Sequence, residues 1–388
     1  MAAINRIAGF AEEMTAWRRH LHAHPELGLD CFETAEFVVE KLREFGVDRI
    51  ETGVARSGVV AVIEGRSPGR SIGLRADMDA LAMDDLTGAE HASTVPGRAH
   101  ACGHDGHTTM LLGAAKYLAE TRNYAGRAVL FFQPAEEGPG GAQLMVEEGT
   151  LDRHEVAEVY ALHTLPGAPE GTFETTPGPI MAAVDTLHVH VIGQGGHGAM
   201  PHEARDPIPA AVAIVQAIQT IITRDRDPLD DLVVSVTQIH AGSADNVIPE
   251  RAYVGATIRT FAEGVRDMAH RRLREVAAGV AAAHGVRAEV EIESGYPPTI
   301  NDPQTTEFAS EIAREVVGDS AVIADRTREM GAEDFSYMLA ERPGAYLFLG
   351  QGAGPALHHP AFDFNDAVAP LGASFFARVV ERALPLDT

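Results

Sequence analysis

Cysteine is scarce in this chain of 388 residues, which contains only Cys31 and Cys102. Two cysteines are too few for a disulfide framework at this length, so we expect a reducing, cytoplasmic location. No apolar run approaches the roughly 20 residues of a membrane-spanning helix. The N-terminal segment also lacks the apolar core of a signal peptide. We therefore expect neither export nor a membrane partner.

Positive charge is scarce as well. Lys and Arg number 31 against 56 Asp and Glu, which gives a net charge of −25, and the only lysines are Lys41 and Lys116. A strongly acidic protein repels phosphate backbones and anionic lipids. We therefore expect neither nucleic acid nor an anionic membrane as a partner.

Two common catalytic signatures are absent or incomplete. No G-x-S-x-G sequence occurs, which argues against a serine hydrolase. One G-x-G-x-x-G stretch, residues 193–198, follows a predicted strand and would suit a nicotinamide oxidoreductase, but proline-containing sequence follows where a helix should begin. A cysteine hydrolase that uses Cys102 and a catalytically silent binding protein are two further hypotheses.

The most informative segment is HACGHDGH, residues 100–107. In an extended segment, positions two apart face the same side, so Cys102 and His104 can approach a metal ion together. A thiolate and an imidazole suit zinc, nickel, cobalt, iron or manganese. The segment thus predicts part of a metal site.

Further candidate ligands follow apolar runs of strand type. Glu136 and Glu137 come directly after such a run, His163 lies at the end of another, and His358 and His359 precede a proline. Strand ends are where α/β enzymes assemble their chemistry. Together these side chains suffice for one or two metal ions with a position left open for water.

Apolar spacing predicts alternating helices and strands in the first part of the chain. His20, His22 and His24 alternate along the first helix, so we expect them to scatter around it. The alternation predicts an α/β layer with a mostly parallel sheet. The predicted helices are 5–22, 33–45 and 107–121, and the predicted strands are 59–65, 71–77, 128–134 and 158–164.

The pattern changes after the Gly- and Pro-rich stretch 168–183. Strands of period two alternate there with helices, which predicts a small antiparallel sheet with helices on one face. We expect an inserted α+β domain at 184–294 within a catalytic domain made of 1–183 and 295–388, whose tail returns to α/β texture. The predicted strands are 186–193, 232–241, 252–261 and 288–294, and the predicted helices are 207–223, 264–284 and, in the tail, 368–383.

The assembled motifs resemble the metal-dependent amidohydrolases that include hippurate hydrolases, N-acyl-amino-acid hydrolases, N-acetyl-diaminopimelate deacetylases and auxin-conjugate hydrolases. The resemblance runs nearly end to end, and it implies that the insertion is a lid that also carries dimerisation. The motifs are WRRHLHAHPELG (17–28), LRADMDAL (74–81), HACGHDGHT (100–108), FFQPAEEG (131–138), ALHT (161–164), GGHGAMPH (195–202), DNVIPE (245–250), IRTF (258–261), GAEDFSY (331–337) and LHHP (357–360).

The resemblance implies a role for particular residues of this chain. Glu136 becomes the general base, and Asp77 lies behind a metal-binding imidazole and orients it. More distant relatives carry His-x-Asp where this chain has Arg75-Ala-Asp77, which leaves the number and identity of the metals open. The implied metal ligands are Cys102, His104, Glu137, His163 and His358.

The implied reaction is the hydrolysis of N-acyl amino acids, with deacetylation of diaminopimelate derivatives and cleavage of auxin conjugates as alternatives in the same class. His197, in a glycine-rich loop, could stabilise the developing oxyanion. Arg259 could clasp the substrate carboxylate with its planar fork. Asn246 could donate to either group. We expect a homodimer, or a higher homo-oligomer, formed through the lid, and in the dimer we expect His197 to complete the partner's site.

Overall fold

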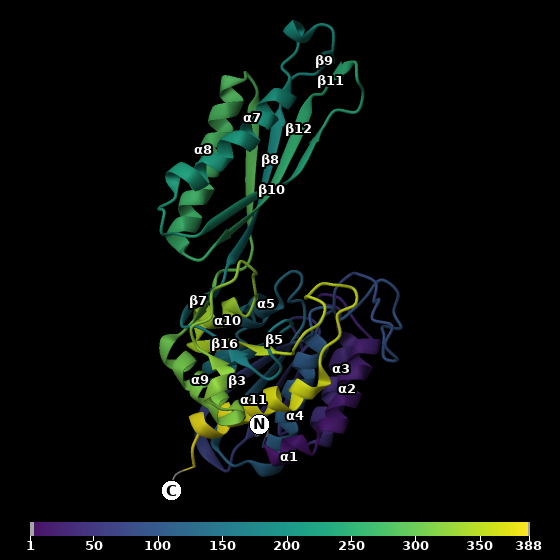
Figure 1. Cartoon of the computed structure of the whole chain (residues 1–388), viewed down its shortest axis with the longest axis vertical. Coiled ribbons are helices and arrows are strands. Elements are labelled where there is room, and N and C mark those ends of the chain that lie inside the picture. Colours follow the sequence, from purple (N-terminus) through teal and green to yellow (C-terminus); the bar gives the residue numbers. More distant parts are fainter. Residues whose placement is uncertain (1–3, 387–388) are drawn as a thin grey trace. The chain divides into compact units, whose positions relative to one another are not determined.

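The computed structural model describes residues 4–386. The chain divides into two compact units. The first unit contains residues up to Ile180, Thr299–Thr327 and the segment from Asp334 onward, and the second contains Met181–Pro298 and Arg328–Glu333 (Figure 1). Each unit has its own hydrophobic core.

An eight-stranded mixed sheet organises the first unit. Its strand order is β1-β2-β4-β3-β5-β16-β6-β15, and the four central strands β4, β3, β5 and β16 run parallel. The predicted α/β class with a mostly parallel central sheet is confirmed. The strands are β1 (Arg49–Val54), β2 (Gly58–Glu64), β3 (Ser67–Asp77), β4 (Ala125–Gln133), β5 (Val156–Leu165), β6 (Phe173–Glu174), β15 (Val322–Ile323) and β16 (Gly344–Gly350), with β7 (Gly178–Met181) and β14 (Thr299–Asn301) forming a separate ladder.

Parallel pairing brings the carboxyl ends of the central strands to one edge of the sheet. Asp77 at the end of β3 is in register with Gln133 at the end of β4, and His163 near the end of β5 is in register with Phe348 of β16. Each of these strands is almost completely buried where it reaches this edge. The residues that follow the strands therefore lie close together, at the place where open α/β sheets bind ligands.

Helix α4 (His104–Thr121) begins at the same edge and is buried over nearly its whole length. It packs against α2, α11 and β3. A helix that is apolar or small on all sides belongs in a core rather than at a surface. The remaining helices of this unit are α1 (Asn5–Ala8), α2 (Ala11–Ala23), α3 (Phe32–Glu44), α5 (Gly141–Glu147), α6 (Thr150–Arg153), α9 (Pro303–Val317), η3 (Asp319–Ala321), α10 (Ser336–Glu341), η4 (Asp366–Val368) and α11 (Ala369–Ala383).

The second unit is a four-stranded antiparallel sheet of order β10-β12-β8-β13 with two long helices on one face (Figure 1). Alternate residues of the strands face the helices and form the second core. A two-stranded ladder, β9 with β11, extends from it. The elements are β8 (Ala183–Ile192), β9 (Gly196–His197), η1 (Pro201–Glu203), α7 (Pro207–Thr220), the π-helical turn η2 (Ile221–Asp225), β10 (Leu232–Ala241), β11 (Val247–Ile248), β12 (Arg251–Thr260), α8 (Glu263–Ala283) and β13 (Arg287–Ser294).

Helix starts in both units follow simple capping chemistry. Asp206 caps α7 and accepts a hydrogen bond from the Ile208 amide at 2.9 Å, and Asp302 caps α9 in the same way. A proline occupies the next position in each helix, where its missing N–H costs nothing. Helix α4 starts three residues earlier than predicted, because Gly103 adopts a left-handed conformation before it.

One expectation about apolar length is wrong. Residues Pro207–Asp225, which are α7 continued by the turn η2, are long and apolar enough to cross a membrane by length and composition. Their buried side chains belong to the second core, and the prolines at the start conceal the length of the helix in the sequence. Burial of one side of this helix in the second core, with the other side exposed, is typical of a helix that covers one face of a sheet.

Candidate metal centre

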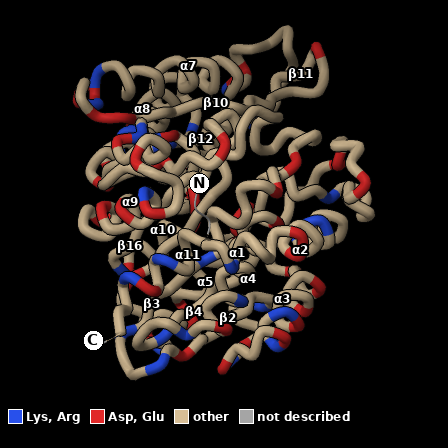
Figure 2. The backbone as a smooth tube through the Cα atoms, turned by 60° about the horizontal axis from the view of Figure 1, so that its bottom comes forward, with Lys and Arg blue, Asp and Glu red and all other residues tan. Residues whose placement is uncertain are grey.

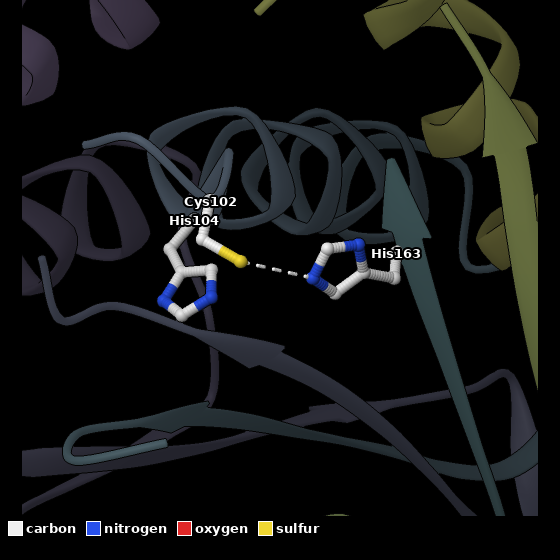
Figure 3. Close-up of side chains that lie close together, drawn as sticks. All are labelled: Cys102, His104 and His163. Atoms are coloured by element: carbon white, nitrogen blue, oxygen red, sulfur yellow. Dashed lines mark hydrogen bonds between the residues drawn. The ribbon is translucent and has the colours of Figure 1, made fainter. Parts of the chain in front are cut away.

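The predicted ligands converge at the carboxyl edge of the central strands. His104 is the first residue of α4, Cys102 lies two residues before it in the preceding loop, and His163 comes from β5 (Figure 3). The Cys102 Sγ atom lies 3.4 Å from His163 Nε2. The predicted residues form three overlapping groups with ligating atoms within 4.8 Å of one another, which are Cys102 with His104 and His163, Cys102 with Glu137 and His358, and His104 with Glu136 and Glu137.

The imidazoles of His104 and His163 are held with one nitrogen toward the centre. His104 Nδ1 donates to the main-chain oxygen of Asp79 at 2.8 Å, and His163 Nδ1 donates to that of Thr164 at 2.7 Å. Each ring therefore presents the lone pair of Nε2. His104 Nε2 is buried, and no residue in the described part of the chain hydrogen-bonds it. A buried acceptor without a hydrogen-bond partner is suited to a role as a metal ligand.

The electrostatics of the centre also fit a cation. Burial raises the pKa of the Cys102 thiol, and the charges of Glu137 and Glu136 raise it further. Burial would lower the pKa of His104, but the charge of Asp77 and the contacts with Asp79 outweigh it and raise that pKa to about 10. The protein thus gathers more negative than positive charge here. Thiolate, imidazole and carboxylate together suit the borderline divalent metals.

Glu136 and Glu137 are held by an aspartate that the sequence analysis missed. The Asp79 carboxylate accepts the amide of Glu136 at 2.9 Å and that of Glu137 at 3.1 Å, while its main chain orients His104. Ala135 before them adopts a left-handed conformation with φ of 59°. Such strain persists where the surroundings impose it, and it commonly marks functional sites. The only sequence signal was an acidic residue that follows a strand.

His358 is better placed as a ligand than its neighbour His359. Its Nε2 lies 3.1 Å from Glu137 Oε1, and its main chain is strained at φ of 63° and donates to Ala101 at 2.8 Å. His359 Nδ1 instead accepts from the amide of Ala361 at 3.1 Å within its own turn. The geometry supports the choice of His358.

The expected role of Asp77 needs a correction. Its Oδ1 accepts from His107 Nδ1 at 2.7 Å, and His107 Nε2 in turn accepts from the Thr164 amide at 2.9 Å. Both nitrogens of His107 are therefore occupied by protein, and this ring is not a free ligand. The imidazole of His104 is oriented by the Asp79 carbonyl instead. The reason is that α4 places His107 one turn beyond His104, directly above the end of β3.

Arg75 forms part of the support beneath the centre. Its side chain is 1 % exposed and donates to Asp77 and to Asp334 at 2.8 Å each, and to Gln133 at 2.7 Å. It neutralises two buried carboxylates next to His107. Arg75 thus acts as a structural cation beneath the centre.

The second unit brings together two of its three predicted residues. His197 on β9 pairs with Val247, and the amide of Gly198 donates to the Asn246 carbonyl at 2.8 Å, so His197 and Asn246 are neighbours on an exposed ladder. Arg259 lies near the far end of β12. That strand has 10 residues and is about 30 Å long, so Arg259 is remote from His197 within this unit.

The glycine-rich stretch 193–198 does not bind a dinucleotide phosphate in the way its pattern suggests. It forms β9 and is followed by the short 3₁₀ helix η1 rather than by a long helix that opens at the last glycine. A phosphate-binding turn needs that helix start. This removes the basis for the oxidoreductase alternative.

Comparison with known proteins agrees with this geometry. The model of peptidase family M20/M25/M40 matches residues 73–382. The chain belongs to this family. It is 36 % identical over 384 residues to the hippurate hydrolase of Campylobacter jejuni, with 99 % of this chain and 100 % of that protein covered. It is 39 % identical to the N-acetyl-L-cysteine deacetylase of Bacillus subtilis, with 94 % and 86 % covered.

A solved structure shares the whole architecture. The crystal structure of a Bacillus subtilis protein, described as a dinuclear metal binding peptidase from the M20 family, superposes with a TM-score of 0.86 at 32 % identity, with 97 % of this chain and 99 % of that chain covered. The predicted resemblance to metal-dependent amidohydrolases is confirmed, and this M20 protein is a hydrolase with a candidate metal-binding centre.

Proposed function

We propose that this M20 protein hydrolyses the amide bond of N-acyl amino acids to a carboxylate and a free amino acid. The convergence of a thiol, three imidazoles and two carboxylates at the carboxyl edge of the sheet carries the proposal. Cys102, His104, Glu137, His163 and His358 hold one or two divalent ions of manganese, zinc, nickel, cobalt or iron. An ion in this set supplies Lewis acidity toward the carbonyl and lowers the pKa of water.

Glu136 acts as the general base in this proposal. It is 7 % exposed, and its carboxylate reaches to 4.0 Å from His104 Nε2, beside the ligands. From there it takes a proton from water and passes it to the leaving nitrogen. The nitrogen then departs as a neutral amine instead of as an amide anion, which is a poor leaving group. Asp79 holds the main chain of Glu136 and thereby fixes where the proton is collected.

A thiol nucleophile is the weaker hypothesis. A nucleophilic cysteine needs a lowered pKa and some exposure. Cys102 has neither, because it is 7 % exposed and the surrounding carboxylates raise its pKa. The two glutamates that disfavour a thiolate favour a cation, so the same side chains argue for the metal.

Metal removal tests the proposal directly. Chelation should abolish hydrolysis of N-acyl amino acids, and added manganese, zinc, cobalt or nickel should restore it. Cys102→Ala should reduce metal occupancy and activity together, whereas loss of a nucleophile would reduce turnover with metal content unchanged. A panel of N-acetyl, N-benzoyl and indoleacetyl amino acids, with N-acetyl-diaminopimelate, identifies the acyl group. Full activity after exhaustive demetallation would refute the metal hypothesis.

Arg259 is the proposed anchor for the α-carboxylate of the substrate. Its guanidinium is half-buried and hydrogen-bonds Thr257 Oγ1 and the Ile258 carbonyl, with no carboxylate bonded to it among the described residues. Burial lowers the pKa of Arg259. A cation left without a bonded anion in a protein of charge −25 is suited to an anionic ligand.

Arg259→Ala should raise KM for N-acyl amino acids by about tenfold or more, because a charge-assisted bidentate pair is lost. The rate on the corresponding N-acyl amino acid amides, which lack the carboxylate, should change little. Steady-state kinetics on matched acid and amide substrates check this. Equal losses on both would assign Arg259 a structural role.

We also propose that the second unit, predicted at 184–294, is a lid that forms a homodimer. Arg259 lies near one end of β12, whereas the His197–Asn246 pair lies on the separate β9–β11 ladder next to the other end of β12, so one lid cannot place both on one small substrate. Two lids related by a two-fold axis can, if His197 serves the partner's site. The edge strand β10 with Ile239, 51 % exposed, and the outer face of α7 with Val212, 45 % exposed, offer the apolar surface for such a contact.

The surface chemistry supports a small-molecule partner in the cytoplasm. Asp and Glu are distributed over both units among fewer Lys and Arg (Figure 2). Both cysteines are free, which suits a reducing compartment. We therefore propose a cytoplasmic enzyme that binds neither nucleic acid nor membrane.

A further inference from the structure

We propose that Arg18 and His22 of α2 are positioning residues of the metal centre, because they hold the two separate segments that carry His104 and His358. The inference rests on the ligand set proposed above. Arg18 and His22 lie four residues apart in the motif WRRHLHAHPELG, whose polar residues have no role in the proposed hydrolysis. Four residues apart on a helix means one common face. That face is buried, since each side chain is 1 % exposed.

His22 connects α2 to the start of α4. Its Nδ1 lies 2.7 Å from Asp105 Oδ2, and its Nε2 lies 3.3 Å from Asp85 Oδ2. Asp105 is the residue directly after the ligand His104, and its own carboxylate is completely buried. The bond from His22 thus fixes the first turn of α4. That turn begins at His104 and directly follows the loop that carries Cys102.

Arg18 connects α2 to the segment that follows His358. Its Nη1 donates to Asp363 and its Nε to Asp366, both at 2.7 Å. Its Nη1 also lies 3.5 Å from Asp105 Oδ2. A single guanidinium therefore spans both ligand-bearing segments, which the planar fork of arginine allows and the ammonium of lysine does not.

The two segments contact each other through their main chains as well. His358 donates its amide to the Ala101 carbonyl at 2.8 Å, and Leu86 beside Asp85 donates to the Pro360 carbonyl at 2.7 Å. These bonds fix the distance between His358 and Cys102 only if α4 and the segment after His358 are themselves held in place. Arg18 and His22 supply that fixation from a helix that carries no ligand.

Charge explains why burial of these groups is tolerated. Burial alone would lower the pKa of His22, but its hydrogen bond to Asp105 and the Asp105 charge outweigh it and raise that pKa. Burial would also lower the pKa of Arg18, and the charges of Asp105, Asp363 and Asp366 reverse it. Two cations thus face four carboxylates, and those of Asp105, Asp363 and Asp366 are hydrogen-bonded to them. Groups behind the ligands of a metal site typically change metal affinity 10- to 100-fold when removed, in rough terms.

The first test is His22→Gln, with His24→Gln, at the C-cap of the same helix, as the matched control. His24 is exposed, and its Nδ1 bonds only the His20 carbonyl, at 2.7 Å. Zinc affinity of the full-length protein is measured by competition with a chromophoric chelator, alongside the unfolding midpoint of the metal-free protein. We expect about a tenfold or greater loss of zinc affinity in His22→Gln and none in the control. Unchanged zinc affinity, whatever happens to the unfolding midpoint, would overturn the role of His22.

The second test does not depend on His22→Gln folding. Arg18→Lys and His358→Ala are combined in a double-mutant cycle of zinc affinity, with Arg6→Lys as control, an exposed arginine that pairs with Glu120. If Arg18 acts through His358, Arg18→Lys should weaken zinc binding in the wild type and have little further effect in His358→Ala. Additive losses would overturn it. His104→Ala tests the proposed metal centre separately from the positioning role of Arg18 and His22. Zinc binding that survives this change intact would refute the metal centre itself.

Discussion

Glu136→Gln should lower turnover by about two to four orders of magnitude while the fold and the bound metal stay in place. The amide is nearly isosteric with the carboxylate but cannot accept the proton of water. Because the main chain of Glu136 is held by Asp79 at 2.9 Å, the substitution should not move the neighbouring residues. Circular dichroism, metal analysis and kinetics on one preparation distinguish loss of chemistry from loss of structure.

Glu137→Gln is the matched control, since the same Asp79 carboxylate holds its amide at 3.1 Å. Glu137 Oε1 lies 3.1 Å from His358 Nε2, so Glu137 stands between ligands, and its amide variant should chiefly weaken metal binding. Activity should then recover in part at high metal concentration. If Glu136→Gln lost the metal while Glu137→Gln lost only turnover, the two assignments would have to be exchanged, with Glu137 as the general base and Glu136 as the metal ligand.

Three of the proposed ligands could be found from the sequence, because His104 opens a helix, Glu137 follows a strand and His163 lies near the end of one. Parallel pairing then brings Glu137 after β4 and His163 at the end of β5 to one edge, whatever the details of packing. His358 is different, because it lies on a strained turn that only tertiary contacts fix. Its assignment depended on the resemblance to relatives rather than on any local pattern.

The supporting residues were not accessible for a physical reason. Asp79 acts through its main-chain oxygen and through amides of a distant loop, and neither contact leaves a spacing in the sequence. Asp77 was assigned to a metal-binding ring, but the phase of α4 places His107 above it. Helical phase also separates His22, which points inward, from His20 and from His24 at the C-cap of α2, whose ring centroids lie 4.6 Å apart.

Some secondary structure was missed or joined for similar reasons. The buried strand β16 has no readable period, because it is an apolar run of only seven residues. Helix α9 was missed although its start carries a capping aspartate and a proline. The first helix, predicted at 5–22, is divided into α1 and α2 at Gly9. The core positions of the two parts keep one apparent helical spacing, which conceals the break.

Mixed dimers of His197→Ala and Glu136→Gln should regain activity that neither parent has. In the proposed arrangement, His197 of one chain completes the site of the other, so each mixed dimer contains one site with both groups intact. Random pairing makes about half of the dimers mixed, which returns roughly a quarter of the wild-type activity. The two variants are unfolded together, refolded as a mixture and assayed against each parent treated alone.

The mixed dimers must be shown to form, which differently tagged chains and tandem purification allow. If His197 acted within its own chain, one site of a mixed dimer would lack His197 and the other would lack Glu136, so no activity would return. Inactive mixed dimers would therefore refute the shared site. The metal centre would be unaffected by that outcome, because its five ligands and Glu136 all belong to the first unit of a single chain.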